Sequence, residues 1–386
     1  MMGSSRTRLE KEGAPVKQHY DYMDYLRVFA MICVVYMHAA AGSLRMYLLS
    51  ANWTGLSILT SLAFCAVPLF FMLSGALILN SERTADFAYV LKKRIPKLLL
   101  PLIVWSAVAA AWLAHQSAEG FTLLGALGRL KDGLSGPVMA HFWFMYTLIG
   151  MYLISLILYL GLKHLPRWGR RALAILLALG MAVATVSFCW PQIGAFLPGQ
   201  IVEELWFFNG HLYALLMGWL LSKYEKKLPN WLLIGLIVLL WGGISVGTYL
   251  RTAQTGAYNA TFQSQNHGFE ILLAACIFQF CRQNLNRPIR CLTGIVRPLA
   301  SLSFPVYLMH NIVISVLYAF GLPHERAAHV ILATVLVILL SYLAVKTLAT
   351  IRPLCYAFTG LTYDEACKSC NWVYTAHKLA RKKSEV

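Results

Sequence analysis

The sequence predicts an all-α polytopic membrane protein with about ten transmembrane helices and both termini in the cytoplasm. Of its 386 residues, 59% are apolar and 13% are charged, whereas about 25% of the residues of a soluble domain are charged. The apolar residues gather in runs of about 17 to 25, the length that crosses a bilayer as a helix. Lysine and arginine concentrate in every second segment between these runs, as in chains that cross a membrane repeatedly.

The expected spans follow one another along most of the chain. Eight of them are clear from their length and apolar composition: residues 25–44, 56–79, 98–114, 142–160, 173–190, 231–249, 299–320 and 330–349. Two shorter runs, 207–221 and 268–280, are included because neighbouring helices can bury a short span. We therefore expect a disordered cytoplasmic tail over residues 1–20, a membrane domain over 21–350 and a cytoplasmic tail over 351–386.

The placement of basic residues gives the orientation. With the N-terminus in the cytoplasm and ten spans, the outer loops hold only five of the 33 lysines and arginines: Arg45, Arg129, Lys131, Arg251 and Arg326. This asymmetry follows the positive-inside rule, and it depends on counting both short runs as spans. The same rule accounts for the net charge of +17. We therefore expect membrane lipids, and not nucleic acid, around this chain.

The nine cysteines do not suggest a disulfide framework. Four of them lie in or at the ends of apolar runs, where cysteine behaves as a small hydrophobe: Cys33, Cys65, Cys189 and Cys276. Cys367 and Cys370 form a CxxC motif with His377 nearby, but a structural zinc site takes four ligands. No metal site is expected.

The first span carries two side chains that are costly inside a bilayer, in the segment LRVFAMICVVYMHAA. Arg27 and His38 are eleven residues apart, which brings a helix back to within about 20° of its starting direction and separates them by about 16 Å along the axis. They therefore share one face at two depths. Arg27 can reach the cytoplasmic surface and pair with Asp24, one turn earlier. His38 lies too deep for that, so it is either a structural residue bonded to a neighbouring helix or a functional one.

Two further segments have both a structural and a functional interpretation. The segment VPLFFMLSG ends an apolar run with Ser74, where small residues let helices approach closely. The segment KKRIPKLLLP begins the third span with Lys93, Arg94 and Lys97. These cations fit the positive-inside rule, and they equally suit a phosphate-binding surface.

Two later segments place more polar groups at span depth. HFWFMYTLIGMYL opens the fourth span with His141 and Trp143 at its outer end, and SLSFPVYLMHNIVI places His310 one turn after Tyr307. Ionisable residues inside membrane spans are candidates for function. Two deep histidines, His38 and His310, strengthen that interpretation over a purely structural one.

These five segments resemble, in the same order, motifs of the acyltransferase-3 family, whose bacterial members O-acylate cell-surface glycans. The arginine and histidine of that family's first helix are matched by Arg27 and His38, and its motif S-[LF]-x-x-Y-x-x-H is matched by residues 303–310. The segments around Ser74 and His141 are similar to its PLFFMLSG and H-[LF]-W-[FY] motifs. At the start of the third span, Lys97 stands where arginine is common. The resemblance covers about residues 21–350 and is strongest to the enterobacterial common antigen O-acetyltransferase type.

The resemblance implies an O-acetyltransferase of the bacterial inner membrane that moves an acetyl group from cytoplasmic acetyl-CoA to a hydroxyl of a lipid-linked or surface glycan. His38 is expected to act as general base or as transient acyl carrier. Three residues are expected to orient it or to stabilise the oxyanion: His310, Tyr307 and Ser74. Four are expected to bind CoA: Arg27, Lys93, Arg94 and Lys97. Four are expected to bind the acceptor: Asp24, His141, Trp143 and Glu203. No permanently bound cofactor is expected, and self-association into a homo-oligomer is left open.

The main alternative is a transporter of glycans or lipids. Such a protein also has many spans and charges within the membrane, but transporters often show two similar halves with broken helices at matching positions. The sequence has no such repeat. A purely structural membrane subunit would explain the apolar composition but not two deep histidines.

Overall fold

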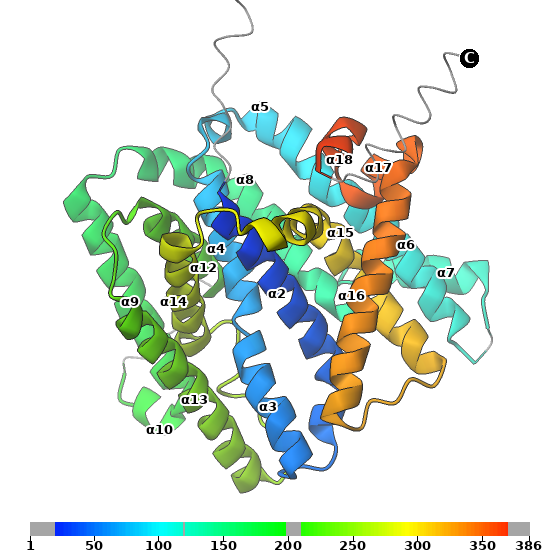
Figure 1. The fold of residues 1–386 in the computed structure, drawn as a ribbon, viewed down its shortest axis with the longest axis horizontal. Helices are drawn as coiled ribbons and strands as arrows, with labels where there is room; N and C mark the ends of the chain where they lie inside the picture. Colours follow the sequence, from blue (N-terminus) through cyan, green and yellow to red (C-terminus); the bar gives the residue numbers. More distant parts are fainter. Residues whose placement is uncertain (1–19, 119, 198–209, 370–386) are drawn as a thin grey trace, which may run out of the picture.

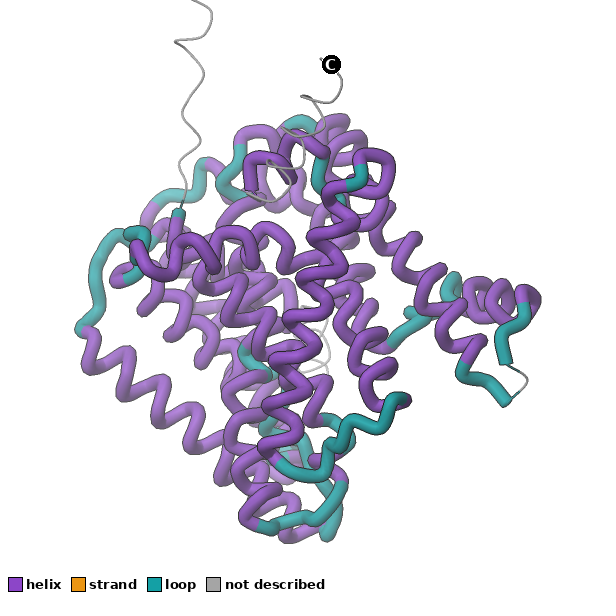
Figure 2. Tube along the Cα trace, turned by 45° about the vertical axis from the view of Figure 1, so that its right-hand side comes forward, coloured by secondary structure: helices purple, strands orange, loops and turns teal. Residues whose placement is uncertain are grey.

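Within residues 20–118, 120–197 and 210–369, which the computed structural model describes, every regular element is a helix (Figure 2). The helices that form the body of the fold are α2 (Asp21–Ala40), α3 (Ala51–Ala63), α4 (Ala66–Ile78), α6 (Ile95–His115), α8 (Trp143–Lys163), α9 (Arg167–Cys189), α12 (Gly210–Lys223), α13 (Asn230–Thr255), α14 (Gly268–Asn284), α15 (Arg290–Ala319) and α16 (Ala327–Thr350). Shorter helices connect these or lie at the ends of the bundle: η1 (Ser43–Arg45), η2 (Glu82–Ala85), α5 (Phe87–Tyr89), η3 (Val90–Arg94), α7 (Leu123–Asp132), η4 (Ala140–Phe142), α10 (Pro191–Gly194), α17 (Arg352–Thr359) and α18 (Tyr363–Ser369).

The helices confirm the predicted class of an all-α polytopic membrane protein. Eight helical stretches within the described residues are long and apolar enough to cross a membrane, and they overlap the eight clear runs of the sequence. The described parts of the two short runs are also helical, as α12 and α14, but with 14 and 17 residues these helices are shorter than those eight. The count of ten and the cytoplasmic placement of both termini therefore stay predictions. Glu203, Cys370 and His377 lie outside the described residues.

The basic segments gather at one end of the bundle. The start of α2, helix α5 and the two last helices, α17 and α18, all lie at the top of Figure 1, whereas α10 and the start of α3 lie at the bottom. The top end also carries the start of α6, with Lys93 and Arg94 just before it. This end, called the basic end below, is the one that the charge pattern predicts to be cytoplasmic.

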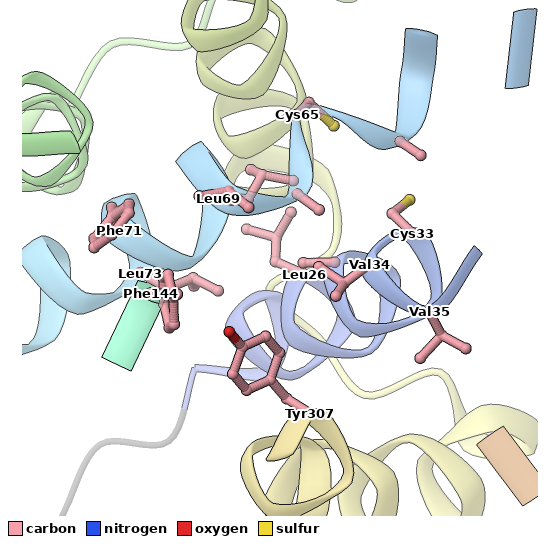
Figure 3. Packing of buried hydrophobic residues seen from close by; sticks show 14 of the residues in the cluster. Leu26, Cys33, Val34, Val35, Cys65, Leu69, Phe71, Leu73, Phe144 and Tyr307 are labelled. Atoms are coloured by element: carbon pink, nitrogen blue, oxygen red, sulfur yellow. The ribbon is translucent and has the colours of Figure 1, made fainter. Parts of the chain in front are cut away.

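Helix α2 is surrounded by other helices of the bundle. It packs against α3, α4, α14, α15 and α16. Its apolar side chains Leu26 and Val34 are buried in one core cluster with Leu69 of α4 and Tyr307 of α15 (Figure 3). Because apolar side chains cannot drive association inside lipid as they do in water, close packing of this kind is what holds such helices together.

Glycines bring α4 and α12 into backbone contact. A Cβ atom at Gly75 would collide with the backbone of Leu215, and one at Gly218 would collide with the backbone of Met72. Helices pack most closely where small residues face each other. The glycine that ends the VPLFFMLSG motif therefore serves helix packing, which was the structural interpretation of that segment.

The last two described helices cover the start of α6. The indole N–H of Trp105 in α6 donates to the carbonyl of Phe358 in α17 over 3.0 Å. Gly360 ends α17 with φ +69°, and a Cβ there would collide with the carbonyl of Lys97. Because glycine adopts this left-handed conformation without strain and carries no Cβ, the chain can turn closely over α6.

Candidate active site

Three histidines from three separate elements meet inside the bundle. His38 comes from the last turn of α2, His141 from η4 and His310 from the middle of α15. The ring centroid of His38 lies 5.0 Å from that of His310 and 5.9 Å from that of His141. The rings of His141 and His310 are 4.7 Å apart. The two deep histidines of the sequence are thus neighbours, together with a third that was predicted for the acceptor side.

Hydrogen bonds hold the His310 ring and the backbone of His141. His310 Nδ1–H donates to the carbonyl of Tyr307, one turn earlier in the same helix. The Tyr307 hydroxyl donates to the backbone carbonyl of His141, which ties η4 to α15. His310 is fully buried, and its Nε2 has no hydrogen-bond partner among the described residues. This ring therefore keeps an unused lone pair next to His38.

Asn311 joins two members of the cluster. Its side-chain N–H donates to His141 Nδ1 over 2.9 Å, and the same nitrogen lies 3.5 Å from His38 Nδ1. His141 Nε2 lies 3.3 Å from the carbonyl of Leu308, which can only accept a hydrogen bond. This pattern assigns the His141 proton to Nε2, and it orients the Asn311 amide with its nitrogen toward both rings.

His38 borders a cavity of about 270 Å³, called the outer cavity below. His141, Trp143 and Tyr307 also line it. Its far side is formed by residues from the end of the bundle opposite the basic end, among them Arg45 and Tyr258. Of the two deep histidines, His38 alone borders this cavity and is partly exposed. His38 is therefore the deep histidine that a molecule in the cavity can touch.

Arg27 and Arg94 both lie at the basic end, each with its own polar partners. Arg27 forms an ion pair with the buried Asp24 carboxylate over 2.9 Å, as the sequence suggests. Arg94 donates to the hydroxyls of Thr84 and Ser81, over 2.7 and 2.8 Å. Both guanidinium groups interact electrostatically with the Tyr152 phenol of α8. Two arginines that are far apart in the chain thus act electrostatically on one partly buried tyrosine.

The two lysines of the KKRIPKLLLP segment differ in their surroundings. Lys97 Nζ contacts both carboxylate oxygens of Glu365 in α18, over 2.6 and 2.7 Å. Burial acts to raise the pKa of the Glu365 carboxyl, but hydrogen bonds from Lys97 and Thr362 outweigh it and hold that pKa below its usual value. Lys93 is exposed at the surface. The lysine that stands in place of the family's common arginine is therefore tied to α18.

The comparison with known families decides which class of protein this site belongs to. The family model described as "Acyltransferase domain" matches residues 20–346. The chain belongs to the acyltransferase-3 family. Comparison with curated proteins and with solved structures gives no match. The matched segment holds the three histidines and both arginines, whereas α17 and α18 lie beyond it. The narrower resemblance to the common antigen type stays a prediction.

The bundle of this membrane acyltransferase does not gather every residue predicted for its site. Ser74 donates its hydroxyl to the carbonyl of Phe70 within α4 and does not line the outer cavity. Asp24 lies at the basic end with Arg27, away from the acceptor candidates His141 and Trp143. Glu203, the remaining acceptor candidate, lies outside the described residues.

Sequence analysis did not identify Asn311 as a site residue of the acyltransferase. It follows His310 directly, in the ninth apolar run, as a second polar residue at the same depth. That position was a usable signal, because polar side chains in a membrane span tend to bond to other helices. The hydrogen-bond partner of Asn311 could not be predicted, because His141 lies 170 positions away in the chain.

Proposed function

We propose that this membrane acyltransferase moves an acetyl group from cytoplasmic acetyl-CoA to a hydroxyl of a lipid-linked or surface glycan at the opposite face of the bacterial inner membrane. The face of α2 that Arg27 and His38 share carries the proposal. Arg27 and Arg94 both lie at the basic end, and His38 lies about 16 Å from Arg27 along the α2 axis, at the outer cavity. A thin pantetheine arm along this face would bring the thioester to His38 while the phosphates stay near the arginines.

The chemistry needs a base at the outer cavity. In direct transfer, the acceptor oxygen attacks the thioester carbonyl and its proton passes to His38. The carbon–sulfur bond then breaks, and the leaving thiolate takes the proton, so that the products are an ester and free CoA. In the other path, a nitrogen of neutral His38 attacks the thioester carbonyl, and the carbon–sulfur bond breaks as the CoA thiolate leaves with the ring proton. The acceptor hydroxyl then attacks the acyl-histidine, the carbon–nitrogen bond breaks, and the hydroxyl proton returns to the imidazole. An imidazole, which can be neutral near pH 7, suits both paths.

His310 and Tyr307 support the base in different ways. His310 already donates its Nδ1–H to the Tyr307 carbonyl, so the free lone pair on Nε2 can accept an N–H from protonated His38. This arrangement resembles the way a second group stabilises the histidine of a catalytic triad. Because the Tyr307 hydroxyl already donates to the His141 carbonyl, we assign it to holding η4 in place and not to the oxyanion.

The outer cavity suits the acceptor. It combines polar groups such as His141 and Arg45 with aromatic rings such as Trp143 and Tyr258, on the side away from the basic end. Sugar hydroxyls can bond to the first kind of group, and sugar ring faces can lie against the second. This supports entry of the donor and the acceptor from opposite ends of the bundle.

The test is acetyl transfer by the purified protein in liposomes that contain lipid-linked glycan. Acetyl-CoA should raise the mass of the glycan by whole acetyl groups, and His38→Ala should slow the reaction at least about a hundredfold. His164→Ala, which changes an exposed histidine after α8, should leave it unchanged. Glycan export without acetylation by the wild-type protein would overturn the proposal in favour of a transporter.

A further inference from the structure

A second cavity, of about 860 Å³, lies at the basic end between the start of α2 and the ends of α4, α12 and α14. It is called the basic-end cavity below. Four cations line it, Lys223, Lys226, Lys227 and Arg282, against one carboxylate, Glu225. Side-chain amides complete much of its lining, among them Asn80, Gln279, Gln283 and Asn286. None of these cations was a predicted donor-binding residue.

The walls of this cavity are joined by hydrogen bonds. Asn80 of α4 donates to the Ser222 hydroxyl of α12 over 2.8 Å. Gln283 of α14 bonds to both the N–H and the carbonyl of Leu228, over 3.2 and 2.9 Å. Arg282 donates to the carbonyl of Tyr224. The loop from Tyr224 to Leu228 is therefore held at both ends against α14.

The lysines of that loop remain available. Lys226 and Lys227 are exposed, and neither forms an ion pair with any residue in the described part of the chain. Lysine ammonium groups bind phosphate as point charges, and arginine adds a planar fork. The backbone of this loop is held in place while its two lysine side chains form no ion pair within the described residues. The loop therefore presents positive charge to an anion in the cavity.

One face of α2 leads from this cavity to His38. Met23 lines the basic-end cavity, and Arg27 follows it after one turn with an offset of about 40° around the axis. His38 comes about 20° from Arg27 and lines the outer cavity. From Met23 to His38 the face is about 22 Å long. The two cavities thus lie at the two ends of the face that the proposed donor occupies.

Side chains at the cavity wall also interact with both arginines, by a hydrogen bond to Arg94 and electrostatically with Arg27. Tyr22, which lines the cavity, interacts electrostatically with Arg282 and with Arg27. Ser81, which lines it as well, accepts a hydrogen bond from Arg94 over 2.8 Å. The basic-end cavity is therefore next to the predicted donor-binding arginines and extends their positive surface.

We propose that the basic-end cavity binds the phosphates at the nucleotide end of the acyl donor, the end remote from the thioester. The proposal rests on the proposed function, which makes the donor a coenzyme A thioester. An anionic lipid headgroup offers the same phosphate chemistry. Continuity with Arg27 and with the face that ends at His38 favours the donor.

The experiment measures ligand binding to the full-length protein in nanodiscs of zwitterionic lipid. The probes are free CoA, adenosine bisphosphate and pantetheine, which lacks phosphate. The double variant Lys226→Gln/Lys227→Gln should weaken the binding of CoA and of adenosine bisphosphate about tenfold, equal to about 1.4 kcal/mol. Its affinity for pantetheine should be unchanged. The matched control, Arg167→Gln/Arg171→Gln, removes two exposed cations from the start of α9 and should bind all three probes as the wild type does.

A second variant guards against a folding effect. Arg282→Lys keeps the charge but loses the fork that holds the Tyr224 carbonyl, so it should bind CoA better than Arg282→Gln. Wild-type affinity for CoA in both the lysine pair variant and Arg282→Gln would overturn the inference. So would a loss, in these variants, of thermal stabilisation by anionic lipid while CoA binding persists, because the cavity would then be a lipid site.

Failure of this inference and failure of the proposed function give different results. An unchanged KM for acetyl-CoA in the cavity variants, with acetyl transfer intact, would overturn the inference alone. Phosphate-dependent binding that the lysine pair variant weakens, without acetyl transfer by the wild type, would overturn the proposed function and support the cavity.

Discussion

Asn311 donates a side-chain hydrogen bond to Nδ1 of His141 over 2.9 Å, and this contact orders the histidine cluster. His141 Nε2 faces the Leu308 carbonyl at 3.3 Å, so both ring nitrogens of His141 are engaged. The same Asn311 nitrogen lies 3.5 Å from His38 Nδ1. One amide therefore sets the orientation of the two rings that border the outer cavity.

Replacing this amide should disturb chemistry more than donor binding. Asn311→Leu leaves the lone pair of buried His141 Nδ1 without a donor, and such an unsatisfied group costs about 1–3 kcal/mol. We expect the histidine rings to turn and kcat to fall about tenfold or more, within the range of a lost acid–base contribution. The affinity for CoA should stay within about twofold, because sites that share no partners couple by no more than about 0.3–0.5 kcal/mol.

The control lies one turn further along α15. The Ser315 hydroxyl accepts from Trp112 over 2.9 Å and does not touch the cluster. Ser315→Ala should therefore leave kcat unchanged. Equal losses in Ser315→Ala and Asn311→Leu would show that Asn311 acts only through the stability of α15.

His38→Ala and Arg27→Ala should fail in different ways, because they lie at opposite ends of one helix face. His38→Ala should lower turnover by about a hundredfold to ten-thousandfold, the usual contribution of a general base, and leave CoA affinity nearly intact. Arg27→Ala should weaken CoA binding by about 1.5–3 kcal/mol, the contribution of a charged hydrogen bond. Turnover under saturating acetyl-CoA and CoA binding by calorimetry separate the two. An active His38→Ala enzyme would return this histidine to a structural role.

The Lys97–Glu365 pair should make stability depend on pH at the basic end. The pKa of Glu365 is lowered in the folded protein. The ion pair therefore stabilises the folded state fully above about pH 4.3, the ordinary carboxyl value. This stabilisation is lost as the pH falls through the lowered pKa of Glu365 in the folded protein. Because both side chains are partly exposed, we expect the contribution to stay below about 1 kcal/mol.

The measurement is the difference in melting temperature between the wild type and Glu365→Gln across this range. The wild type should melt higher at neutral pH, and the two melting temperatures should converge as the pH falls below the ordinary carboxyl value of about 4.3. A difference that grows as the solution becomes more acidic would contradict the pairing of Glu365 with Lys97.

The contact between α4 and α12 should tolerate no side chain at Gly218. A Cβ there meets the backbone of Met72, which cannot move aside as a flexible side chain can. Gly218→Ala should therefore lower the melting temperature, with a cost of about 1–3 kcal/mol for overpacking. Gly235→Ala in α13 is the matched control, because its Cβ would have nothing within 4 Å. If both variants melt alike, the close approach of these helices is wrong.

Local rules were sufficient to predict the arrangement along single helices. The helix period places Arg27 and His38 on one face, and the apolar runs match the eight long helical stretches. Contacts between helices were not predictable in the same way. His141 joins the cluster because η4 packs on α15 through the Tyr307 hydroxyl, and Lys97 meets Glu365 across 268 positions. Such pairs depend on tertiary packing, which no local pattern of residues encodes.

The central claim is that the donor and the acceptor reach His38 from opposite sides of the membrane, and vesicles of known orientation test it most directly. Both preparations must contain the lipid-linked glycan. In inverted vesicles, where the cytoplasmic face is outside, added radiolabelled acetyl-CoA should label glycan within the lumen. In right-side-out vesicles the same addition should label nothing, because CoA does not cross the bilayer. Equal labelling in the two orientations would contradict the account.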